Sequence, residues 1–449
     1  MSDTSFRWTW PLLYLLAAPL LADAAVAADE KHRFVASRAA GTVDRVEFAL
    51  DVGGELTAVL AGAEPRKEKM SVRCTLRYDE LTLDFVPSGE GGIHTVRYYE
   101  EAAATIVHSD RSFTPVVRPG RMLIVSLIEP PEVSVLSPAG PLTRDELDVM
   151  DLIGNSAVLD LLLPTEPVAV GESWALDEGV LAALLRMDEV QRSDVAVTLT
   201  EVADVVSRFE MAGSVTGLAE GVPSDIELKA RFRFLRGRQR VDWLGMLVRE
   251  HRTQGPASGE MDAVARVQIT LTPGESPPEL SEEILESLPL EPSPETLLLV
   301  CQPADGSWSF IHDRRWFHLD DQEEAAALRL VEGGELIAHC NVALLPPASP
   351  EKPPVLEQFQ HDIRNALGER FGRFVEASQR AGGDDYRILR SVIAGTINET
   401  PNFWYYYLIA DPQGRRVVFA FSVRADYVEP FAGEAEVLIE SFRFAPAEG

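Results

Sequence analysis

The sequence predicts an α+β protein that is mostly antiparallel β, with a β-rich meander domain followed by a linker and an α/β domain. Three observations predict this class. Apolar and polar residues alternate from about residue 33 to residue 272, proline and glutamate dominate residues 273–295, and an amphipathic helix then precedes an aromatic hairpin. Alternation is the period of a strand with one dry and one wet face. The 449 residues also exceed what one ordinary core accommodates.

Residues 1–28 have the pattern of a signal peptide. Arg7 precedes an apolar run from Trp8 to Leu21, and Ala25-Val26-Ala27 supplies the small residues that a signal peptidase requires. The run is too short for a convincing transmembrane span. We therefore expect export to the periplasm or the exterior, with no transmembrane segment in the mature chain. An uncleaved anchor is the alternative, because Asp3 weakens the positive charge ahead of the run.

The charge of the chain excludes some partners. The sequence has 41 basic and 71 acidic residues, for a formal net charge of -30. A strongly acidic surface repels phosphate backbones and anionic membranes. We therefore expect no nucleic-acid partner, and we interpret the acidity as a source of solubility.

The three cysteines, Cys74, Cys301 and Cys340, form no CxxC pair. Neither a zinc ribbon nor a thioredoxin-like redox site is therefore indicated. Cys301 and Cys340 fall in the same predicted domain, and a disulfide between them and two buried thiols are both compatible with the sequence.

Residues 31–272 are predicted to form the β-rich domain. In residues 225–236 the even positions from Ile226 to Phe234 are apolar, and most of the intervening positions are charged. Similar runs are expected as strands at residues 43–50, 195–206, 239–252 and 262–271. Glycines between several of these runs indicate short turns, so each strand should pair mainly with its sequence neighbour.

Two short helices interrupt these strands. Thr143 and Glu146 are spaced as a capping box at the start of the first helix, and residues 177–190 carry an apolar stripe at helical spacing. We expect the helices to plug or cap the sheet. They divide the strands into an early and a late group, so two curved half-sheets and two subdomains both fit the pattern, and the sequence does not decide between one sheet and two.

Residues 273–295 are predicted to be an extended linker, with a few helical residues around residues 284–288, because a segment rich in proline and glutamate resists packing. The last domain, residues 296–449, begins with strands expected at residues 297–301, 308–311, 326–330 and 335–345. A long amphipathic helix is expected from Leu356 to Phe374, ended by Gly382-Gly383, and a strand at residues 386–397 follows. Residues 437–444 should close the chain as a short helix or strand.

The hairpin from Asn402 to Val423 is the strongest local pattern. Both faces of its first strand are apolar, which indicates a strand covered on two sides. Asp411-Pro412-Gln413-Gly414 has the residues of a tight turn, since proline presets one dihedral and glycine accepts a positive φ. We interpret the aromatic run from Phe403 to Tyr407 mainly as core, with a binding groove as the alternative.

The C-terminal third resembles PsbP-like domains. The resemblance rests on the order of strands, proline-rich break, long helix and aromatic hairpin, and on the ending Glu440-Ser441-Phe442-Arg443-Phe444. It implies an α/β sandwich used for protein association in exported proteins, with no chemistry of its own. The β-rich region is similar in pattern to curved-sheet carrier domains of bacterial envelope proteins.

The sequence offers no catalytic or metal-binding motif. It lacks the G-x-S-x-G elbow, the H-E-x-x-H helix and the calcium loop. His312 and His318 would share one face of a strand, but Arg314 and Arg315 between them would repel a cation. The other histidines are scattered: His32, His94, His108, His251, His339 and His361. We therefore predict no catalytic residues, no metal ligands and no cofactor, and ligand-binding residues cannot be assigned.

The acidic segment at residues 320–324 is interpreted as a solvated turn or helix start. The function predicted from the sequence is an exported, non-enzymatic role in the cell envelope, in protein association or in binding an apolar ligand. One alternative is a secreted hydrolase whose site is assembled from separated residues. The other is a structural envelope component that self-associates through an edge strand or a cysteine.

Overall fold

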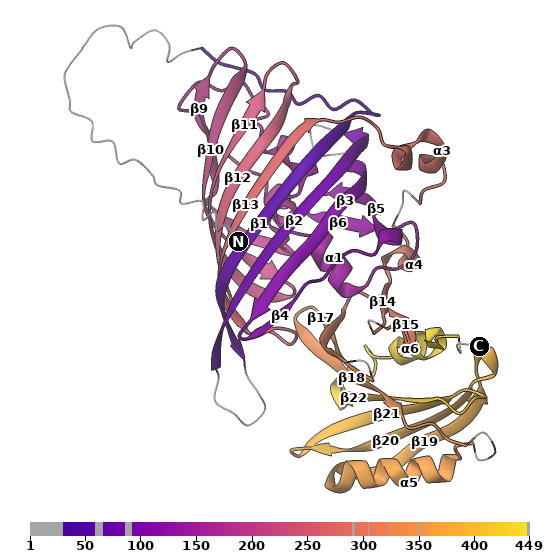
Figure 1. Ribbon diagram of the computed structural model, residues 1–449. Helices are drawn as coiled ribbons and strands as arrows, with labels where there is room; N and C mark the ends of the chain where they lie inside the picture. Colours follow the sequence, from indigo (N-terminus) through magenta and orange to yellow (C-terminus); the bar gives the residue numbers. More distant parts are fainter. Residues whose placement is uncertain are drawn as a thin grey trace, which may run out of the picture.

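The structure is a computed structural model that describes residues 30–58, 66–85, 92–289, 292–303, 305–322, 324–349, 351 and 353–446. The predicted signal peptide at residues 1–28 lies outside these residues, as does Glu323 of the acidic segment. Most of the described chain is antiparallel β-structure in open sheets (Figure 1).

The β-rich region forms one 13-stranded sheet, with a main path ordered β6-β5-β3-β2-β1-β13-β12-β11-β10-β9-β7. Its strands are β1 (Val43–Ala58), β2 (Arg66–Phe85), β3 (Ile93–His108), β4 (Arg111–Phe113), β5 (Leu123–Glu129), β6 (Glu132–Leu136), β7 (Ser173–Ala175), β8 (Glu189–Ser193), β9 (Ala196–Val202), β10 (Val206–Ala219), β11 (Val222–Leu235), β12 (Arg240–Arg252) and β13 (Glu260–Pro273). Most strands pair with sequence neighbours, as predicted. The first strand also pairs with the last, with Phe48 opposite Ile269, so the early and late groups form one sheet and not two.

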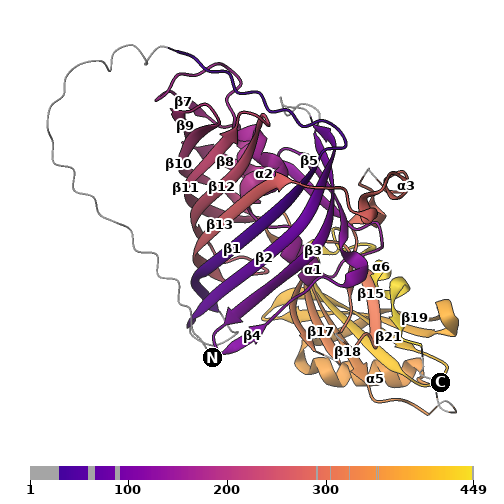
Figure 2. The ribbon, with the colours of Figure 1, turned by 45° about the horizontal axis from the view of Figure 1, so that its top comes forward.

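Three short helical segments cover one face of this sheet (Figure 2). They are α1 (Arg144–Met150), the 3-10 helix η2 (Ser156–Leu162) and α2 (Glu178–Leu185). The capping box of Thr143 and Glu146 is present at the start of α1. Their apolar side chains fill the sheet face, and Val158, Leu159 and Leu181 are fully buried there. The three segments therefore plug this face of the sheet as expected, and we call them the plug.

The second helix is shorter than predicted. It ends at Leu185 because Arg186 adopts a left-handed conformation with φ 57°. Residues Glu189–Ser193 form strand β8 along β10, so the expected helix through Val190 is wrong beyond this point.

After β13, the described residues 274–289 and 292–298 are not extended throughout. They contain the 3-10 helix η3 (Pro278–Leu280) and the short helices α3 (Glu282–Leu285) and α4 (Pro294–Leu297). Leu280 is buried in a cluster with Val43, Leu81 and Val96. The alternation of β1 places Val43 on the face opposite the buried Val46. This segment therefore packs on the face of the large sheet that the plug leaves open.

The C-terminal region is built on a seven-stranded sheet ordered β16-β17-β18-β22-β21-β20-β19. Its strands are β16 (Trp316–Gln322), β17 (Ala325–Glu332), β18 (Glu335–Leu345), β19 (Phe371–Ala381), β20 (Arg387–Ile397), β21 (Thr400–Ala410) and β22 (Arg416–Arg424). A small sheet contains β14 (Leu299–Cys301), β15 (Trp308–His312) and β23 (Arg443–Phe444). Helix α5 (Leu356–Leu367) packs on one face of the seven-stranded sheet, and α6 (Glu434–Ser441) packs with the small sheet on the other.

The long helix expected from Leu356 to Phe374 ends at Leu367. Gly368 has φ 54° with ψ -123°, a backbone conformation that side-chain-bearing residues avoid, so the helix cannot continue through it. Phe371 and Phe374 belong to strand β19, and both rings contact the Arg364 guanidinium, at 4.8 and 5.6 Å from its carbon to the ring centroids. In the sequence, the three-residue spacing of Phe371 and Phe374 continues the helical pattern, although neither residue lies in a helix.

The aromatic hairpin is present as predicted, formed by β21 and β22. Its turn places Gly414 at φ 89°, and the Gly414 N–H donates to the Asp411 carbonyl at 3.1 Å. Trp404 is buried toward α5 and Tyr407 is buried toward α6. The two-sided apolarity of the first strand therefore reflects a sheet covered on both faces.

Two arginines connect the two large sheets. Arg144 of α1 donates to the Trp316 carbonyl at 3.2 Å. Arg314 donates to the carbonyls of Val135 and Leu297 at 2.6 and 2.8 Å. Charged donors to backbone carbonyls fix the orientation of the sheets at this junction.

All three cysteines are buried, and the described part of the chain contains no disulfide. Of the alternatives left open by the sequence, the structure therefore has buried thiols at Cys301 and Cys340. None of the helices in the described ranges combines the length and the apolarity that crossing a bilayer requires.

Candidate functional site

The structure brings His312 and His318 together from two different strands, whereas the sequence analysis considered them on one face of a single strand. His312 ends β15 and His318 lies in β16, on the two sides of a tight connection. Their Nε2 atoms are 3.1 Å apart, and His312 Nδ1 donates to the Asp313 carbonyl at 2.8 Å. Burial lowers the pKa of His312 to about 3. This imidazole is therefore neutral, and its Nε2 accepts a hydrogen bond from His318.

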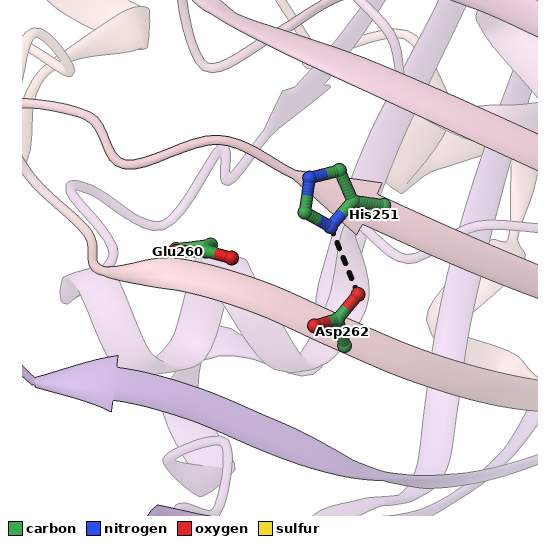
Figure 3. A group of neighbouring side chains, drawn as sticks. All are labelled: His251, Glu260 and Asp262. Carbon is green, nitrogen blue, oxygen red and sulfur yellow. Dashed lines mark hydrogen bonds and ion pairs between the residues drawn. The ribbon is translucent and has the colours of Figure 1, made fainter. Parts of the chain in front are cut away.

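A different histidine lies in a group with metal-ligand geometry. His251 of β12 and Glu260 and Asp262 of β13 each present one donor atom, and these atoms all lie within 4.8 Å of one another (Figure 3). His251 Nδ1 is 2.8 Å from Asp262 Oδ1. The sequence analysis counted His251 among scattered histidines. Only the register of β12 against β13, which pairs His251 with Asp262, could have revealed the group.

The surroundings of His251 are acidic, because Glu260 and Asp262 lie beside it. The hydrogen bond to Asp262 raises the pKa of His251, although burial opposes the shift. Lys67 is one nearby cation, with Nζ 3.9 Å from Asp262 Oδ2, and Arg249 lines the same hollow as His251. His251 and Asp262 are about half exposed, at 44% and 53% of their side-chain surface, so solvent and ions reach them.

A hollow of about 580 Å³ adjoins this group. Residues of five neighbouring strands, β1, β13, β12, β11 and β10, line it, and His251 and Asp262 are among them. Gly53 of β1 lacks a side chain at this point, and no heavy atom lies within 4 Å of the position its Cβ would take, which leaves room above the backbone. The volume is within the usual range for small-ligand pockets, about 300–1,000 Å³.

A second groove, of about 520 Å³, lies between α5 and the seven-stranded sheet, and we call it the α5 groove. Its lining is mostly apolar and comes from α5, the segment before it, and strands β18, β21 and β22. The lining residues are Leu345, Pro353, Pro354, Val355, Gln358, Phe359, Asp362, Ile363, Ala366, Tyr406, Leu408, Arg416 and Val418. Sequence reasoning considered a groove at the aromatic run, and Tyr406 is the member of that run that lines this one.

Charged side chains also meet inside the plugged face of the large sheet. Arg38 Nε donates to Asp160 at 2.6 Å, and Arg97 Nε donates to Glu80 at 2.8 Å. These four side chains are at most 4% exposed. Ser156 donates to the same Glu80 oxygen at 2.8 Å, which joins the plug to the sheet. Because its charges are paired and buried, this network is a structural feature that positions the plug.

No family model and no curated protein matches the chain. Among solved structures, the Saccharomyces cerevisiae Ran-binding protein Mog1p is similar at a TM-score of 0.26 and 10% identity, over 33% of this chain and 95% of that chain. The cyanobacterial PsbP of Synechocystis sp. PCC 6803 is similar at a TM-score of 0.26 and 16% identity, over 33% and 92%. OccK11 of Pseudomonas aeruginosa is similar at a TM-score of 0.13 and 7% identity, over 87% and 98%. PsbP, the expected family, is thus among the matches, at scores too low to support an argument about function.

Proposed function

We propose that the chain is an exported, non-enzymatic binding protein that holds an acyl chain with an anionic head group in the α5 groove. The observation that carries this proposal is the groove itself, with about 520 Å³ enclosed mainly by apolar side chains. An acyl chain gains free energy by leaving water for such a surface, about 0.8 kcal/mol per buried CH₂ group.

The α5 groove is the better apolar site because the large sheet is already filled. Leu159, Leu181 and Val197 are fully buried where the plug meets the sheet. The chain's own side chains thus occupy the face where a curved-sheet carrier would hold its ligand. At the α5 groove, by contrast, Val355 is 48% exposed and Tyr406 is half-buried, so apolar surface remains available.

Arg416 supports an anionic head group. Its Nε and Nη2 atoms donate to the Pro346 carbonyl, with the Nε distance at 2.9 Å. A guanidinium has five N–H donors, so two bonds to one carbonyl leave donors for a carboxylate. Asp362 also lines the groove, and its Oδ1 accepts a hydrogen bond from Gln358 at 2.8 Å. We therefore place the head group at Arg416 and the acyl chain along Phe359 and Leu408.

The proposal can be tested by titrating the full chain with a fluorescent fatty acid such as parinaric acid. Ala366→Glu places a carboxylate in the groove, whereas Asn365→Glu adds the same charge to an exposed neighbour outside it. The wild type and the Asn365 variant should bind saturably, and the Ala366 variant should lose at least about tenfold in affinity, equal to 1.4 kcal/mol. Absence of saturable binding by the wild type, or equal binding by both variants, would overturn the proposal.

Self-association is the second candidate, and one observation favours it. Strand β19 is an 11-residue edge of the seven-stranded sheet, and nearly all its side chains are exposed. Unpaired edges can template pairing with another chain. The buried cysteines make a thiol route less suitable, so a β19 dimer should form equally with and without reductant. Sedimentation of the wild type and of Val375→Pro would test this, because proline removes an N–H donor from the edge.

A further inference from the structure

We propose that His251, Glu260 and Asp262 form a binding site for one divalent transition-metal ion of the Zn²⁺ type. The three donor atoms, one imidazole nitrogen and two carboxylate oxygens, lie within 4.8 Å of one another (Figure 3). An ion placed among them would have ligands of the kinds that zinc accepts. This site is separate from the α5 groove and does not depend on the function proposed for it.

The sheet itself positions the three donors. His251 and Asp262 are directly opposite each other in the register of β12 and β13. Glu260 lies two residues before Asp262 on the same strand, and side chains two apart project from the same face. Neighbouring strands lie about 4.8 Å apart, so side chains on one face of two paired strands can bring their donor atoms within reach of one ion. The donors therefore converge because of backbone pairing and not through chance side-chain rotamers.

The present hydrogen bond shows that two of the donors already point at each other. His251 Nδ1 and Asp262 Oδ1 are 2.8 Å apart and share a proton. A metal ion would replace this proton, and two carboxylates would balance its charge. Lys67 competes as a cation, with Nζ 3.9 Å from Asp262, but its side chain is 60% exposed and can turn into solvent. The adjoining hollow leaves room for the waters that complete the coordination.

Two other histidines of the same sheet have carboxylate partners, but neither forms a group of three donors around one point. His108 Nε2 is 3.1 Å from Glu68, a pair with one carboxylate. His94 approaches two carboxylates through opposite ring nitrogens, with Nδ1 3.7 Å from Asp84 and Nε2 4.0 Å from Glu129. The two nitrogens of one imidazole ring point away from each other, so they cannot bind the same ion. Within the described ranges, only the His251 group brings three such donors together.

The test uses the full chain after treatment with a chelator and dialysis. Calorimetric titration with Zn²⁺ should give one ion per chain, and Co²⁺ should give a visible absorption band that Zn²⁺ displaces. His251→Ala and Asp262→Asn should each weaken binding by more than about tenfold. His108→Ala is the matched control, since it removes a histidine that has a single carboxylate partner on the same sheet, and it should bind as the wild type does.

Glu260→Gln keeps the shape of the third ligand while removing its charge, so it remains informative if another variant misfolds. It should retain the wild-type circular dichroism spectrum and lose about tenfold or more in affinity. The proposal is overturned if the wild type binds no Zn²⁺ at micromolar concentrations. It is also overturned if the His251 and Glu260 variants bind as tightly as the wild type, or if the His108 variant loses as much as they do.

Discussion

Substitution of Asp160 by asparagine tests the buried charge network that joins the plug to the large sheet. Asp160 accepts hydrogen bonds from Arg38 Nε at 2.6 Å and from the Val241 N–H at 2.7 Å. The side chains of both Arg38 and Asp160 are fully buried. Asparagine keeps an oxygen for the Val241 N–H but removes the charge, so the variant isolates the ion pair.

The expected loss of stability is about 3 kcal/mol. Removing one partner of a buried ion pair costs roughly 3–5 kcal/mol, because the remaining charge is left buried without compensation. Glu80 lies 3.5 Å from Arg38 Nη1 and offsets part of this, which places the value at the lower end. The double variant Asp160→Asn with Arg38→Met removes both charges and should recover at least half of the loss.

Urea unfolding followed by circular dichroism measures these values, with midpoints compared only where the slopes agree. The double variant is the control for general disturbance of the site. The reasoning fails if Asp160→Asn changes the free energy of unfolding by less than about 0.5 kcal/mol. It also fails if the double variant is no more stable than the single one.

Three further predictions concern pH, backbone geometry and thiol access. The pKa of His312 falls from 6.5 to about 3 on folding, so below pH 6.5 the unfolded chain binds a proton that the folded chain does not. The free energy of unfolding should therefore decrease as the pH drops below about 6.5, by up to about 1.4 kcal/mol per pH unit. Urea unfolding at pH 7 and pH 5 should show a smaller decrease for His312→Gln than for the wild type. Gly414→Ala should destabilise by more than about 2 kcal/mol, because φ is 89° and a Cβ would lie 2.1 Å from the Ala348 carbonyl oxygen. Gly333→Ala, with φ 56° and open space around it, should cost only about 1 kcal/mol in the same unfolding assay. Burial raises the pKa of Cys74 to about 12, so its thiol should react with Ellman's reagent only after unfolding, and fast reaction in the native chain would contradict its burial.

Local chemistry made part of the fold predictable. The capping box of Thr143 and Glu146 and the turn from Asp411 to Gly414 depend on residues within three or four positions of each other, and both are present. Alternation in β11 identified a strand with one buried face, since the pattern depends only on the period of the backbone.

The pairing of strands that are distant in the sequence could not be predicted. Nothing in β1 indicates that Phe48 lies opposite Ile269, and this pairing is what joins two strand groups into one sheet. The helix boundary at Leu367 was missed for a different reason. Phe371 and Phe374 keep helical spacing, and only the backbone conformation of Gly368 separates them from the helix.

The His251 group was missed and the α5 groove was anticipated only through the aromatic run, because both sites depend on register and layer packing. His251 and Asp262 are 11 residues apart, and they meet only because β12 and β13 pair at that point. The α5 groove combines Val355 with Leu408 and Val418, which are distant in sequence. His312 and His318 were considered on one face of a single strand, but they meet across the connection between β15 and β16.

Hydrogen exchange with and without a bound fatty acid tests the central claim, that the α5 groove is a ligand site. Slower exchange is predicted in α5 (Leu356–Leu367) and in the part of β21 near Leu408, because the ligand would bridge the helix and the sheet. The 13-stranded sheet should exchange at unchanged rates. Protection located in that sheet, or no protection at a saturating fatty-acid concentration, would contradict the account.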